Sequence, residues 1–192
     1  MSIGFVLISK NPTCTIFSNG SQELPVGCKH FIRRYNFKWG AYWVPLFLRL
    51  DVTDLSMTYL GGGPLSSDRE KIATWRWQAE EQQNELIIWE VNANKMTRFP
   101  VYVQDVVTGP IAWSPDNQRL IYIQIENNCP VSGKSYLVLV DITTQEQTLL
   151  LESENPAFGG VEWNYVNVLS VLDANGNEWR YNLLTHKLIQ IP

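Results

Sequence analysis

The feature that most restricts the fold of this chain is a short pattern that returns along it. Four segments place an acid or amide between two apolar residues at the end of a strand-like run and continue into a short, mostly polar link. They are Leu50-Asp51-Val52, Trp89-Glu90-Val91, Val140-Asp141-Ile142 and Tyr181-Asn182-Leu183. The central positions are 39, 51 and 41 residues apart. A repeat of this length predicts a series of similar supersecondary units that stack on one another.

A second element recurs out of phase with the first. Residues 109–123 (GPIAWSPDNQRLIYI) align with residues 63–75 when Asp68 is set on Asp116, and residues 160–172 repeat the element with a shortened turn. Asp in such a turn accepts hydrogen bonds from its own backbone two residues on. We therefore expect Asp68 and Asp116 to form turns and not to act as catalysts.

Strand signals dominate the sequence between these turns. Residues 120–125 and 136–141 are rich in β-branched and aromatic types and end at turn residues. Asn175-Gly176 separates two further runs and predicts a tight hairpin, because both residues tolerate positive φ. Residues 78–85 (QAEEQQNE) have no apolar face, so we interpret them as a solvated connection between strands.

The best-preserved unit is Trp113-Ser114-Pro115-Asp116-Asn117, followed by a strand and then a strand that ends at Val140-Asp141-Ile142. It resembles the blades of WD-repeat and TolB-type β-propellers, in which Ser-Pro-Asp-Gly follows the first strand. Asn117 stands where Gly is usual and accepts the same left-handed turn. The missing Gly-His pair of full WD repeats favours the TolB type. The resemblance covers about residues 46–192 and implies an all-β fold, a small or partial β-propeller of about 3–4 four-stranded antiparallel blades.

On this interpretation the chain is a single propeller-like domain, residues 1–192. Residues 1–54 would supply N-terminal strands and a degenerate first blade, followed by blade two (55–101), blade three (102–151) and blade four (152–192). Strands of blade three are expected at about 108–113, 119–125, 135–141 and 146–151. The second of these lacks a polar face, so we expect neighbouring blades to cover both of its sides.

The number of blades raises the question of closure. About four blades is the lower limit for a closed propeller. Either the chain closes a small ring, with residues 1–45 wrapping it, or it forms an arc that a second copy or another protein completes. The end faces of such an arc are expected to be large apolar patches, which mark interaction sites. We therefore favour self-association or partner docking.

The most unusual segment is residues 24–50. It contains five cations, seven aromatic residues and no Asp or Glu. Because the whole chain carries −4 and this segment carries +5, the remaining residues carry −9. Basic and aromatic residues are thus concentrated in one segment of an otherwise acidic chain.

Four interpretations of this segment stay open. It can be a strand pair whose aromatic residues enter the core while its cations face water. Arg and Trp also anchor contacts with an acidic protein surface, whereas rings and cations together suit single-stranded nucleic acid. Residues 42–47 would suit interfacial contact with a lipid bilayer. Among the functional interpretations we favour a protein partner, since the negative net charge disfavours nucleic acid. The candidate partner-binding residues are Arg33, Arg34, Tyr35, Lys38, Trp39, Tyr42 and Trp43.

The sequence offers no pattern for a catalytic, cofactor or metal site. HExxH, GxSxG and paired-Cys motifs are absent. We expect a packing role for His30 and a turn role for His186. Cys14, Cys28 and Cys129 are odd in number and lack CxxC spacing, which predicts free thiols and neither a disulfide framework nor a zinc site. We predict no cofactor and no enzyme activity.

The remaining expectations concern location and function. The chain has no run of about 18 apolar residues, and its first residues lack the basic start of a secretory signal. We expect a cytoplasmic protein without a transmembrane segment. The predicted function is that of a non-catalytic binding or scaffold protein that docks another protein through a propeller surface. The alternative is a glycosidase-like propeller hydrolase, with carboxylates from different blades meeting in the central channel.

Overall fold

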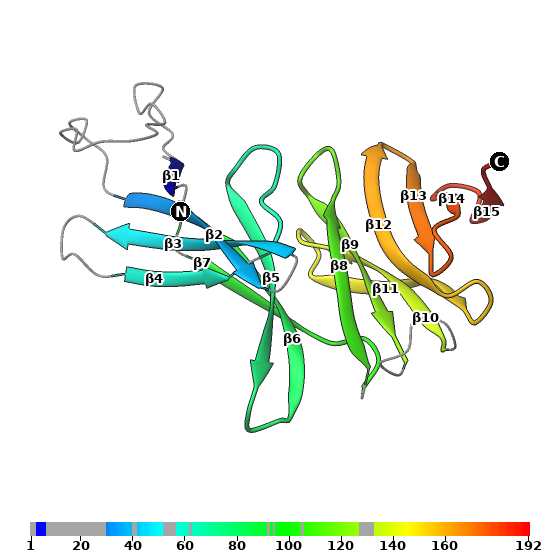
Figure 1. The fold of residues 1–192 in the computed structure, drawn as a ribbon, viewed down its shortest axis with the longest axis horizontal. Coiled ribbons are helices and arrows are strands. Elements are labelled where there is room, and N and C mark those ends of the chain that lie inside the picture. Colours follow the sequence, from blue (N-terminus) through cyan, green and yellow to red (C-terminus); the bar gives the residue numbers. More distant parts are fainter. Residues whose placement is uncertain are drawn as a thin grey trace. The chain divides into compact units, whose positions relative to one another are not determined.

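The computed structural model describes the backbone of residues 3–6, 30–39, 42–51 and 57–61, and whole residues over 63–91, 93, 95–104, 106–126 and 133–192. Every regular element in these residues is a β-strand, and every strand pair of described register is antiparallel (Figure 1). The all-β prediction is confirmed. The chain divides into two compact units, Met1–Arg76 with Ile87–Arg98, and Trp77–Leu86 with Phe99–Pro192.

The first sheet has the strand order β1-β2-β3-β4. Its strands are β1 (Ile3–Val6), β2 (His30–Trp39), β3 (Tyr42–Asp51) and β4 (Met57–Gly61). β2 and β3 pair along their whole length, from His30 opposite Asp51 to Trp39 opposite Tyr42. The acid-free segment therefore folds largely as two paired strands. β4 falls in the span expected for blade two, but it pairs with β3.

A three-stranded sheet follows, with β5 (Lys71–Gln78), β6 (Gln83–Glu90) and β7 (Lys95–Pro100) in the order β5-β6-β7. The predicted solvated connection at 78–85 is wrong in part, because only residues 79–82 form the turn. β6 begins at Gln83, three residues before the apolar run that starts at Leu86, and Glu85 within the strand is buried. Gln78, the last residue of β5, donates a hydrogen bond to the carboxylate of Glu85.

The third and fourth sheets each have four strands in chain order. The third contains β8 (Val107–Trp113), β9 (Arg119–Ile125), β10 (Ser135–Asp141) and β11 (Glu146–Ser153). The fourth contains β12 (Phe158–Tyr165), β13 (Val168–Asp173), β14 (Glu178–Asn182) and β15 (Lys187–Gln190). The strands expected for blade three are thus observed to within two residues, and the predicted Asn175-Gly176 hairpin joins β13 to β14.

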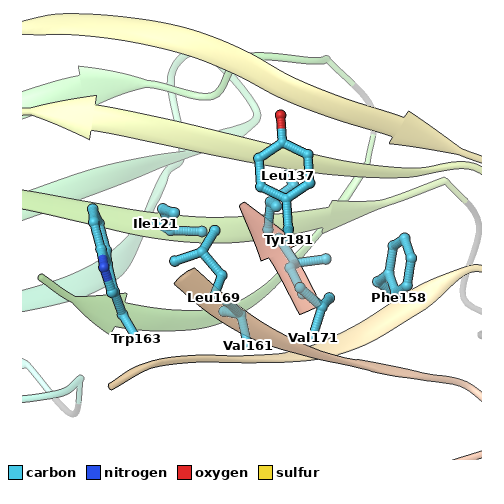
Figure 2. Close-up of a cluster of buried hydrophobic side chains, with 9 residues drawn as sticks. Ile121, Leu137, Phe158, Val161, Trp163, Leu169, Val171 and Tyr181 are labelled. Carbon is cyan, nitrogen blue, oxygen red and sulfur yellow. The ribbon is translucent and has the colours of Figure 1, made fainter. Parts of the chain in front are cut away.

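The third and fourth sheets share a hydrophobic core. β12 lies against β8 and β9, and side chains from both sheets interleave (Figure 2). The buried members of the core are Ile121, Ile123, Leu137, Phe158, Val161, Trp163, Leu169, Val171 and Tyr181. On β9 and β13 the core residues alternate along the strand, as period-2 geometry requires. On β12 a register shift between Phe158 and Gly160 brings Phe158 to the same face as Val161.

The other face of β9 and β10 is buried as well. Gln124 is fully buried, and its side-chain amide exchanges two hydrogen bonds of 3.0 Å with the backbone N–H and C=O of Val103. Tyr122 donates to Gln147 Oε1 (2.7 Å), and Gln147 Nε2 donates to the carbonyl of Pro100 (2.9 Å). The chain that leads into β8 is thereby held on this face. β9 is covered on both sides as expected, but the contacts on this side come from the connecting segment 100–103 and not from strands of a neighbouring blade.

The outer face of the fourth sheet is mixed in polarity. Leu172 and Ile189 are exposed there, and the neighbouring positions are occupied by Glu162, Ser170 and Arg180. The expectation of a large apolar end face is therefore wrong for this sheet. The physical reason is that Glu162, Ser170 and Arg180 lie directly opposite one another across the sheet, so polar positions interrupt the apolar outward residues.

Candidate docking surface

The predicted turn formers occupy the turns between strands. In the third sheet, Ser114 Oγ donates to Asp116 Oδ1 (2.5 Å), which also accepts from the backbone N–H of Gln118 (3.0 Å). Asn117 has φ 58°, the left-handed conformation expected where Gly is usual. Arg119 then lies with its guanidinium carbon 5.2 Å from the ring centroid of Trp163, which ties the turn to the fourth sheet.

The same turn recurs at the aligned position upstream. Ser66 Oγ donates to Asp68 Oδ1 (2.6 Å), and the backbone N–H of Glu70 donates to the same oxygen (2.9 Å). Arg69, aligned with Asn117, has φ 62°. Both turns are closed by matching backbone bonds between their first and last residues. The alignment of Asp68 with Asp116 is confirmed in atomic detail.

A second kind of turn follows the apolar–polar–apolar triplets. Asp141 Oδ1 accepts from two successive backbone N–H groups, and Asn182 Oδ1 does the same after β14. His186 occupies this last turn at φ 54°, as predicted. Its Nδ1 lies 2.9 Å from the hydroxyl of Tyr181, which donates to the carbonyl of Leu150. Because that hydroxyl proton is committed to Leu150, His186 Nδ1 must be the donor to the tyrosine oxygen.

The hairpin after β13 is closed by a buried carboxylate. Asp173 accepts four hydrogen bonds of 2.9–3.0 Å from the backbone of Asn175, the backbone and side chain of Asn177, and the indole of Trp179. The carboxylate oxygens of Asp173 are thus occupied within the hairpin itself. Burial would raise the pKa of Asp173, but the bonds from Asn177 and Trp179 outweigh it and lower the pKa to about 2.

The other turn carboxylates are held ionised too. The hydrogen bond from Ser114 lowers the pKa of Asp116. Burial would raise the pKa of Asp68. The hydrogen bonds from Ser66 and from the backbone of Glu70, together with the charge of Lys71, outweigh burial and lower this pKa. A general acid needs a pKa near the working pH. These three aspartates are therefore suited to shaping turns and unsuited to donating protons at neutral pH.

The described side chains also bear on whether the chain can bind a metal ion. Among residues 63–192 as far as they are described, no three His, Cys, Asp or Glu side chains gather closely enough to hold a metal ion. Cys14, Cys28 and Cys129 lie outside the described residues, and His30 is described only as a backbone position of β2. Nor does any helix in the described part of the chain reach the length and apolar character needed to cross a bilayer.

The pairing of β2 with β3 divides the seven candidate partner-binding residues between two faces. Directly opposite residues in an antiparallel pair belong to the same face, and successive residues belong to opposite faces. One set of positions contains Arg33, Tyr35, Trp39 and Tyr42, and the other contains Arg34, Lys38 and Trp43. The structure therefore does not bring all seven candidates together.

The two faces differ sharply in composition. The face of the first set is aromatic or aliphatic at every position of the two strands except Arg33. The second face is mixed, and two further residues join its candidates, Phe47 opposite Arg34 and Arg49 opposite Ile32. Sequence reasoning missed these two because it selected a nearly continuous run of residues, whereas a strand pair groups alternate ones.

Repeated four-stranded antiparallel sheets joined by these turns are the blades of β-propeller proteins. No protein-family model matches the sequence, and no curated protein matches it either. Solved structures do share the fold. Each of the three described next is a longer chain that this one covers in part.

An oligogalacturonate lyase solved in complex with manganese superposes with a TM-score of 0.58 at 17% identity, covering 85% of this chain and 49% of the lyase. The β-propeller domain of the Trilobed protease from Pyrococcus furiosus gives 0.52 at 13% identity, with 85% and 53% covered. The acylaminoacyl peptidase of Pyrococcus horikoshii gives 0.53 at 12% identity, with 85% and 30% covered. The chain thus spans about half or less of each structure, and these similarities show the propeller fold alone.

Proposed function

We propose that this chain is a non-catalytic binding protein that docks another protein through its β1–β4 sheet. The observation that carries the proposal is the folding of the acid-free, aromatic-rich segment into the paired strands β2 and β3. Pairing concentrates cations and rings within one sheet, and Arg and aromatic residues dominate the energy of protein interfaces.

Charge supports a protein partner with an acidic surface. The segment carries +5 in a chain whose other residues carry −9, so attraction of an acidic partner would be directed to this one sheet. Such attraction mainly speeds association and selects the partner.

The three turn aspartates do not fit the general acid that the glycosidase-like alternative needs. A glycoside hydrolase needs one carboxylic acid that is protonated when the substrate binds. Asp68, Asp116 and Asp173 are instead held ionised by hydrogen bonds within their turns. A hydrolase would require another carboxylate pair, and removing one member would abolish its activity.

The test is capture followed by reconstitution. The tagged chain is used to capture partners from native lysate at low and high salt, and the captured protein is then purified and titrated against the chain. We expect saturable binding that weakens as salt rises, because exposed charges are screened over about 10 Å at 0.1 M salt. Turnover of a polysaccharide panel by the purified chain, with no protein partner reconstituted, would contradict the proposal.

A further inference from the structure

We infer that one face of the β2–β3 pair, the basic face of Arg34, Lys38, Trp43, Phe47 and Arg49, binds an extended acidic segment of a partner protein. This inference rests on the proposed function and makes it specific. It names five positions of one face and removes Arg33, Tyr35, Trp39 and Tyr42 from the binding surface.

The register places each of two cations opposite an aromatic residue. Lys38 is paired with Trp43, and Arg34 is paired with Phe47. Directly opposite residues have Cβ atoms about 5 Å apart, and diagonal neighbours are about 7–8 Å apart. Arg49, opposite Ile32, is therefore a diagonal neighbour of Arg34 and adds a third cation to the same face.

The spacing of the cations fits an extended chain. Arg34 and Lys38 are four residues apart on β2, which is about 13 Å along a strand. An extended segment that runs beside β2 repeats its side chains at the same rise. Carboxylates four residues apart in the partner would therefore meet both cations. The middle one of the three residues between them would lie level with Asn36 and Pro45, which are paired.

The composition of the opposite face explains why it is not the binding surface. All of its positions except Arg33 are aromatic or aliphatic. A sheet with one apolar and one mixed face packs the apolar side and leaves the mixed side to water. The fourth sheet shows this division directly, since Leu169 and Val171 are buried while Leu172 and Arg180 are exposed.

Charge favours a protein segment over nucleic acid. The face has three cations, and Asp51 lies at its end opposite His30. The net charge of the remaining residues, −9, repels the phosphates of a nucleic acid strand longer than this face. A short acidic segment can satisfy the cations without extending so far, while Trp43 and Phe47 supply apolar contact for its intervening residues.

The test measures binding of fluorescein-labelled poly-glutamate to the full chain by anisotropy at low salt. Arg34→Gln with Lys38→Gln removes two cations of the basic face, and Arg33→Gln removes the adjacent cation of the opposite face. Lys95→Gln removes an exposed cation of β7 and is the control for net charge. Thermal melting of each variant checks that it is folded.

We expect the Arg34/Lys38 variant to weaken poly-glutamate binding about tenfold, because two ion pairs with the glutamates are lost. Arg33→Gln and Lys95→Gln should change it less than about twofold. Equal weakening by Arg33→Gln, no binding of poly-glutamate, or tighter binding of oligo-uridylate would each overturn the inference.

Two further outcomes distinguish failure of this inference from failure of the proposed function. If a reconstituted protein partner binds wild type and the Arg34/Lys38 variant equally, docking stands and the basic face is not its site. If no protein partner is reconstituted and poly-glutamate is not bound, both the proposed function and this inference fail.

Discussion

The third and fourth sheets have the same strand order, but their second strands, β9 and β13, differ in burial. Five consecutive residues of β9, 120–124, are buried, so both faces of that strand are covered. On β13 only alternate residues, Leu169, Val171 and Asp173, are buried, and Leu172 is 42% exposed. One repeat unit therefore produces two kinds of second strand, β9 covered on both faces and β13 with one face exposed.

The comparison separates what turns determine from what strands determine. Asp141 and Asn182 cap equivalent turns in the same way, accepting from two successive backbone N–H groups. The difference lies at the outward strand positions, where β9 has Leu120, Tyr122 and Gln124 while β13 has Ser170 and Leu172. Turn chemistry builds a blade, and the residues at alternate positions decide whether a second layer covers it.

The largest expected effect is on the shared core. Ile123→Ala should lower the free energy of unfolding by about 3 kcal/mol, because Ile123 is fully buried between the two sheets. Leu172→Ala, an aliphatic truncation on the outer face, should cost less than about 1 kcal/mol. Urea denaturation of both variants at neutral pH measures the difference. Equal losses would mean that the outer face of the fourth sheet is covered in solution.

A smaller loss is expected at the second face of β9. Gln124→Ala leaves the backbone N–H and C=O of Val103 without their partner, which should cost about 2 kcal/mol. Ser170→Ala on the outer face of β13 is the matched control and should cost about 0.5 kcal/mol. Hydrogen exchange gives a local readout, since the amide of Val103 should exchange faster only in Gln124→Ala. Unchanged protection of that amide would contradict the role of Gln124.

The sequence predicts local features of this fold better than it predicts paired ones. The Ser-Pro-Asp-Asn turn and its left-handed Asn117 are local, since every bond closes within five residues. The partner of Gln124 lies 21 residues upstream, and nothing in the strand's own sequence specifies it. A buried amide in an apolar run indicates only that some polar partner must exist.

The candidate docking surface shows the same limit. Composition identified the segment, but the division between Arg33 and Arg34 depends on strand register. A shift of one residue would exchange the two faces. The pair Trp39 and Tyr42 belongs to this register. The sequence alone does not show which residues are paired, and it therefore shows only a basic, aromatic run. Phe47 and Arg49 join the basic face for the same reason.

Acid should destabilise the protein in part through Asp173 in the fourth sheet. The folded-state pKa of Asp173 is about 2, below its ordinary 3.8. A lowered folded-state pKa stabilises the protein above the unfolded value, and this stabilisation is lost as the pH falls from about 4 to about 2. Asp173→Asn should therefore flatten the decline of stability in this window and lower stability at neutral pH. Urea midpoints across the window measure it, and a variant with an unchanged acid decline would show that Asp173 does not drive it.

The smallest expected effect tests whether the outer face of the fourth sheet is free. Ile189 is 60% exposed on β15 and is paired with Arg180, so Ile189→Ser should change the free energy of unfolding by no more than about 0.5 kcal/mol. If a second copy packed its own sheet here, the substitution would cost more, and the cost would depend on protein concentration. Melting of wild type and variant over a wide concentration range distinguishes the two cases. A concentration-dependent loss would place the fourth sheet in the same class as the third, covered on both faces.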